Sequence, residues 1–118
     1  MLDLTYKKNR IKHTIETLLK DIKHQSLPVR AVIIFGSIAT NTFDENSDLD
    51  ICIIHHGEGD YCIDTHFAAR MEVESYLGEI VEHELNIDFV HTTKKGYDNG
   101  KYVFESVRQE GRVIYGEL

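Results

Sequence analysis

The sequence predicts an α/β fold, a mixed sheet of about four strands with helices packed on it. Two runs of β-branched and apolar residues, 29–35 and 48–54, have the character of buried strands. Before them, apolar residues recur at helical spacing, and helical and extended patterns continue to alternate to the end of the chain. At 118 residues the chain is expected to form one domain, spanning 1–118.

The first half of the chain is predicted to hold one long helix and two strands. The helix covers about residues 4–24, with one apolar face toward the sheet, formed by Ile11, Ile15, Leu18, Leu19 and Ile22. The strand Val29–Phe35 follows, and a short helix begins at Ser37. Turn residues fill positions 41–47 before the second strand, Asp48–Ile54.

The second half continues the alternation. A long helix is expected near residues 64–84, and a third strand over Asn86–Thr92. A helix of about residues 99–110 then ends at Gly111, which is a suitable residue for a helix C′ position. The last prediction is a closing strand, Arg112–Tyr115.

Two acids at the start of the second strand are the main candidates for chemistry. Asp48 and Asp50 should share one strand face, roughly 6.6 Å apart at about 3.3 Å per residue. Their mutual repulsion would be relieved by a cation, and oxygen ligands suit Mg²⁺ completed by substrate phosphates. The first strand ends on Gly36 and Ser37, where the backbone can approach a phosphate and donate hydrogen bonds. This pattern predicts a site for a nucleoside triphosphate and metal ions.

Asp88 is the third candidate. It lies among apolar residues in the third predicted strand, and it joins Asp48 and Asp50 if that strand lies beside theirs. Asp88 would then help to hold a second metal ion and would accept a proton from the hydroxyl group that attacks the nucleotide. His91 is expected at the surface, and no histidine or cysteine has the spacing of a zinc ligand.

This combination of residues resembles the minimal nucleotidyltransferases of the DNA polymerase β-like superfamily. The matching features are Gly36-Ser37, the segment 47–50, Asp88 and the ending 110–115. The resemblance implies the polymerase β-like nucleotidyltransferase fold, two Mg²⁺ ions and ATP as substrate. It also implies transfer of AMP to a tyrosine hydroxyl of an all-helical HEPN-type partner, with this chain acting as the antitoxin of a toxin–antitoxin pair. Ile38 is a departure, because the family often has arginine there; Lys94, Lys95, Lys101 or Arg108 is a candidate replacement.

Charge and composition limit the partners. A net charge of −7 and a sequence pI near 5.4 argue against nucleic acid as the acceptor. No segment approaches the length of a membrane span, and Cys52 and Cys62 are expected to be reduced thiols in a cytoplasmic protein. A homo-oligomer is possible. Two alternatives to the protein-modifying enzyme remain: a catalytically weak interaction module that neutralises a helical partner, and a nucleotidyltransferase of the antibiotic-modifying type acting on small molecules.

Overall fold

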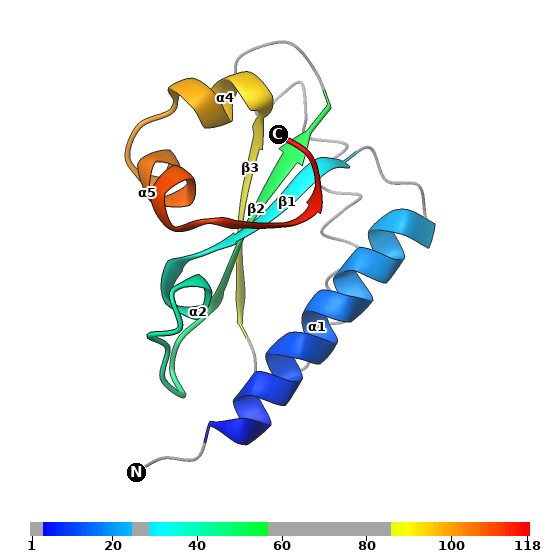
Figure 1. Ribbon diagram of the computed structural model, residues 1–118, viewed down its shortest axis with the longest axis vertical. Coiled ribbons are helices and arrows are strands. Elements are labelled where there is room, and N and C mark those ends of the chain that lie inside the picture. The colour runs from blue at the N-terminus through cyan, green and yellow to red at the C-terminus, as the bar shows by residue number, and fades with distance from the viewer. Residues whose placement is uncertain (1–3, 25–28, 57–85) are drawn as a thin grey trace.

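The computed structural model describes residues 4–24, 29–56 and 86–118, which form a four-stranded sheet with helices on both faces (Figure 1). The strand order is β3-β2-β1-β4. The strands are β1 Val29–Phe35, β2 Leu49–His55, β3 Ile87–Thr93 and β4 Arg112–Gly116. The helices are α1 Thr5–His24, α2 Gly36–Ala39, α4 Lys94–Asn99 and α5 Val103–Glu110.

Strand directions make the sheet mixed, as predicted. β1 pairs antiparallel with both β2 and β4, whereas β2 pairs parallel with β3. β2 and β3 each begin one residue later than the sequence indicated, and β4 extends to Gly116. The helix expected over residues 64–84 lies outside the described residues.

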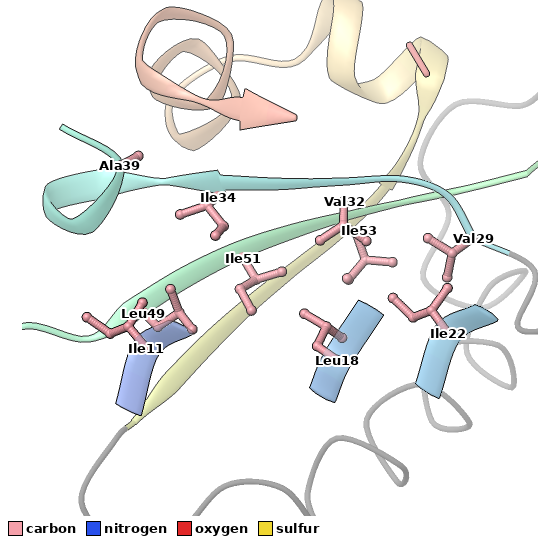
Figure 2. Close-up of a cluster of buried hydrophobic side chains, with 10 residues drawn as sticks. All are labelled: Ile11, Leu18, Ile22, Val29, Val32, Ile34, Ala39, Leu49, Ile51 and Ile53. Carbon is pink, nitrogen blue, oxygen red and sulfur yellow. The ribbon is translucent and has the colours of Figure 1, made fainter. Parts of the chain in front are cut away.

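Helix α1 covers one face of the sheet (Figure 1). Its residues Leu18 and Ile22 are buried and point toward β1 and β2, where they meet Val29 and Ile53 (Figure 2). Ile15 packs at the margin of the same core. The helix forms here because its apolar face has a large apolar sheet to cover, and burial of each such side chain contributes roughly 1.5–3 kcal/mol.

Helices α4 and α5 lie over the opposite face (Figure 1). Val107 of α5 is 1% exposed and packs with Ile33 and Cys52. The sequence indicated one helix of about residues 99–110, which overlaps α5 but begins four residues too early, and it did not indicate α4. The local signal for α4 is Thr93, whose side chain accepts a hydrogen bond from the Gly96 amide at 3.2 Å and so caps the helix.

Gly111 follows α5 but does not have the left-handed conformation expected of a C′ glycine, since its φ is −69°. The prediction of its role was wrong, and the reason for glycine is space. A Cβ at this position would collide with the carbonyl oxygen of Val107 and would lie 2.6 Å from Cγ2 of Ile33. Glycine therefore lets the chain pass from α5 into β4 close against β1.

Two buried imidazoles join β2 to β3. Nε2 of His55 and Nδ1 of His91 are 2.8 Å apart, and the side chains are 1% and 3% exposed. The expectation that His91 lies at the surface was wrong. Parallel pairing of β2 with β3 places His91 opposite Ile53, on the α1 face of the sheet, where it contacts His55. Cys52 is a free thiol, as expected, and burial raises its pKa to about 12. Cys62 lies outside the described residues.

No helix in the described part of the chain combines the length and apolar character needed to cross a membrane.

Candidate active site

The turn after β1 brings the backbone of Gly36 against a carboxylate. Phe35, the last residue of β1, pairs with Asp50 of β2, and Gly36 follows with a φ of +74°. A Cβ on Gly36 would collide with Oδ2 of Asp50. Two features favour glycine at this position. The positive φ disfavours other residues, and the Asp50 carboxylate occupies the space that a side chain would need. Ser37 comes next, at the start of α2, and is half-buried.

The parallel pairing of β2 with β3 brings the carboxylates together. Asp50 and Asp88 are partners in the register, so their side chains leave the same face of the sheet. Asp48 directly precedes β2 and interacts electrostatically with both. All three acids named from the sequence therefore lie at the end of the sheet where β2 and β3 begin, beside Gly36.

The electrostatics of these acids favour a bound cation. The pKa of Asp50 is raised, first by partial burial and then by the charges of Asp88 and Asp48. The pKa of Asp88 is also raised, by partial desolvation, by the charge of Asp48 and by a side-chain hydrogen bond with it. Both groups thus resist carrying their charges at once. A divalent cation would offset that repulsion, and a donor set made only of oxygens fits Mg²⁺.

No group of three or more His, Cys, Asp and Glu side chains within residues 4–24, 29–56 and 86–118 is arranged to hold a metal ion by itself.

The loop before Asp48 has a defined shape that sequence analysis described only as a turn. The Asn46 amide donates to Oδ1 of Asp44 at 2.8 Å, and the Asp44 amide donates to Oγ of Ser47 at 2.9 Å. The pKa of Asp44 is lowered, first by the Asn46 amide and then by the Ser47 hydroxyl, which donates to Oδ1 of Asp44 at 3.2 Å. In addition, Nζ of Lys7 in α1 donates to the carbonyl oxygen of Ser47 at 2.6 Å. Asp44 could have been found from its spacing to Ser47, but no sequence signal indicated Lys7.

Ile38 faces away from the carboxylates. It packs against the core on the α1 face, whereas Asp50 and Asp88 lie on the other face. A cavity of about 400 Å³ lies beside Ile38, and the cations at this cavity are Lys8 and Lys12. The full lining of the cavity is Lys8, Ile11, Lys12, Ile15, Glu16, Ile38, Asn41 and Phe43.

Two of the basic residues named as candidates to replace an arginine at position 38, Lys94 and Arg108, lie in helices and have structural partners there. Lys94 follows the last residue of β3 and is paired with Asp98 at 2.5 Å. Because Asp88 is at the start of that strand, Lys94 is roughly 20 Å from it at about 3.3 Å per residue. Nη1 of Arg108 donates to the carbonyl oxygen of Tyr97 at 2.6 Å. Both side chains therefore have structural partners in α4.

Comparison with known proteins places the chain in a family. The model of the polymerase β nucleotidyltransferase family matches residues 13–117. A Methanocaldococcus jannaschii protein, named as a candidate protein adenylyltransferase (MJ0126), is 31% identical over 107 residues, which cover 91% of this chain and 95% of that protein. The chain thus belongs to the polymerase β nucleotidyltransferase family, as the motif had indicated, and is a transferase of the minimal type.

Solved structures agree with the fold. A mutant of the toxin–antitoxin MntA–HpeT contains a chain with a TM-score of 0.57 and 18% identity. A toxin–antitoxin crystallised with AMP-PNP contains one with a TM-score of 0.53 and 17% identity. Each alignment covers 87% of this chain and 73% of the other. The polymerase β-like nucleotidyltransferase fold predicted from the sequence is confirmed.

Proposed function

We propose that the protein transfers AMP from ATP to a hydroxyl group of a partner protein, with the partner an all-helical HEPN-type toxin and this chain its antitoxin. The observation that carries the proposal is the register of Asp50 with Asp88, which places these two carboxylates with Asp48 beside the Gly36 turn. Family membership supports nucleotidyl transfer. The relative named for protein adenylylation and the fold shared with toxin–antitoxin chains support the choice of acceptor.

The residues have distinct roles in this reaction. Asp48 and Asp50 would hold two Mg²⁺ ions together with the triphosphate, and Asp88 would complete the second site. When bound, Mg²⁺ supplies positive charge that offsets the charge developing on the phosphates. Gly36 and Ser37 would hold the β- and γ-phosphates, since a close backbone approach and a hydroxyl donor are available there.

The chemical step is an exchange of one phosphorus–oxygen bond for another. The acceptor oxygen bonds to the α-phosphorus of ATP, the bond from that phosphorus to the bridging oxygen breaks, and pyrophosphate leaves. The proton of the acceptor hydroxyl passes to the carboxylate of Asp88. Asp88 is the carboxylate chosen for this step because it is exposed at the start of β3, where an acceptor hydroxyl can reach it.

The test is transfer of label from α-labelled ATP to a HEPN-type partner by the unmodified protein and by the Asp48→Asn and Asp50→Asn variants. Both variants should lose transfer, since each removes a charged oxygen ligand. Their metal-free forms should be more stable than the unmodified protein, by up to about 1 kcal/mol, because the repelling charges are partly solvated. Thermal unfolding without metal measures this.

Two results would count against the proposal. Undiminished transfer by both variants would remove the acids from the reaction. Lower thermal stability of both metal-free variants would mean that the acids have structural partners.

A further inference from the structure

Lys7 connects α1 to the loop that carries the first carboxylate. Its Nζ lies 2.6 Å from the carbonyl oxygen of Ser47, and both residues are half-buried. The next residue is Asp48. A hydrogen bond from a charged donor is stronger than one between neutral groups, and partial burial shields it from water.

The start of the loop is anchored by Phe43, which packs against the α1-face core, and by the Thr42 amide, which donates to the carbonyl oxygen of Ser37 at 2.8 Å. Lys7 adds a tie at the other end of the loop, next to Asp48. The bonds between Asp44, Asn46 and Ser47 are internal to the loop. On the strand side, the Leu49 amide donates to the carbonyl oxygen of Asn86 at 2.9 Å, so the chain is tied to β3 directly after Asp48. The residues on either side of Asp48 are therefore both held by hydrogen bonds, Ser47 to α1 and Leu49 to the residue before β3.

A tie is needed at this point because Asp48 is repelled by both of its acidic neighbours when all three carboxylates are ionised. Asp50 and Asp88 are held in paired strands, whereas Asp48 precedes the first residue of β2. Repulsion from Asp50 and Asp88 acts to move the least constrained of the three outward. A bond to the preceding carbonyl opposes that movement and holds the three acids together before any cation binds.

We propose that Lys7 is a positioning residue for the transfer reaction: its ammonium group holds the Ser47 carbonyl and thereby sets the place of the Asp48 carboxylate relative to Asp50 and Asp88. Lys7 acts through the backbone and contacts no substrate. The inference rests on the proposed function for its catalytic consequence, but the restraint on the loop is a property of the protein alone.

The experiment compares Lys7→Met with Lys8→Met in the full chain. Methionine keeps most of the length of the side chain and removes the donor. Lys8 is the neighbouring residue on the same helix and is exposed, so its variant makes the same change in net charge. Amide hydrogen exchange over residues 44–49 should be about tenfold faster in Lys7→Met and unchanged in Lys8→Met, because loss of a charge-assisted hydrogen bond frees the loop. Amides of β1 report global opening and should exchange at the same rate in both variants.

Metal binding and kinetics give two further measurements. Affinity for Mn²⁺ in the presence of a non-hydrolysable ATP analogue should fall about tenfold in Lys7→Met alone, as expected for a displaced ligand. With saturating metal and ATP, kcat should fall and KM for ATP should change much less.

The outcomes separate the two proposals. Equal exchange over residues 44–49, or equal Mn²⁺ affinity, in the two variants would overturn the role of Lys7. Faster exchange with an unchanged kcat would overturn it as well. If the unmodified protein transfers no AMP but the variants still differ in exchange and in Mn²⁺ affinity, the proposed function fails and the positioning of Asp48 by Lys7 stands.

Discussion

Asp88 is an exposed residue whose pKa is nevertheless raised, first because its surroundings remove some of its water and then because the charge of Asp48 acts on it. The other two acids, Asp50 and Asp48, have different structural environments. Asp50 is a residue of the central strand β2, and Asp48 is held through the loop. The three acids therefore have different environments, which allows different roles in one reaction.

Replacing Asp88 with asparagine should separate turnover from binding. We expect kcat for AMP transfer to fall at least about 100-fold, the usual contribution of a general base, while the affinity for Mg²⁺–ATP changes less than about threefold. Label transfer measured beside ATP affinity checks this. Glu105→Gln, which changes an exposed acid on α5, is the control and should alter neither quantity. The reverse pattern, a loss of affinity with normal kcat, would move Asp88 out of the proton-transfer step.

The candidate site residues could be named from the sequence because each is signalled locally. Gly36 ends an apolar run, and the spacing of Asp48 and Asp50 in a strand puts them on one face. The contribution of Lys7 could not be predicted, because it depends on a contact between residues forty positions apart, and many lysines of an amphipathic helix look alike. Ile38 shows the same limit, since only the structure shows that it faces the α1 side.

The strands and the long helix α1 were the elements predicted best, because an apolar pattern marks them over many residues. α1 and the four strands have nearly the expected bounds. The short helix α4 was missed: it has six residues, it includes Gly96, and it is defined mainly by its cap at Thr93. The passage from α5 to β4 was misjudged at Gly111, where tertiary packing, not local conformation, requires glycine.

Gly111→Ala should destabilise the protein by about 1–3 kcal/mol, because the added methyl group meets a backbone carbonyl and a buried isoleucine. Denaturant unfolding measures the effect. The matched change Gly96→Ala lies inside α4, where alanine favours the helix, and should be neutral or stabilising by up to about 1 kcal/mol. An unaltered midpoint for Gly111→Ala would show that β4 can shift away from α5 at little cost.

At the scale of the whole molecule, the two faces of the sheet differ: one carries most of the apolar core and the other carries the candidate site. Its α1 face carries the larger apolar core. The opposite face carries the Asp50 and Asp88 carboxylates at one end, and α4 and α5 also lie over that face (Figure 1). β2 lies between two neighbours and is buried along most of its length. Asp48 and Asp50 thus lie at the start of a buried strand that is paired on both sides, which suits a site that must hold a fixed geometry.

Mg²⁺ and ATP should bind together, because the aspartates leave metal positions for phosphate oxygens to fill. Calorimetry should show ATP binding at least about tenfold tighter with Mg²⁺ than with a chelator, a difference of about 1.4 kcal/mol. A variant carrying both Asp48→Asn and Asp50→Asn should lose this dependence on metal. ATP binding of equal strength with and without Mg²⁺ in the unmodified protein would contradict the site as described.

The place of β4 has a consequence for the order in which the protein forms during synthesis. β1 and β2 are close in sequence and can pair early, but Val32 of β1 also pairs with Tyr115, which lies near the far end of the chain. One edge of β1 therefore has unpaired amides and carbonyls until residues 112–116 have been synthesised. An unpaired strand edge attracts other chains. A chaperone that shields the edge of β1 until β4 is synthesised would therefore aid the folding of this chain.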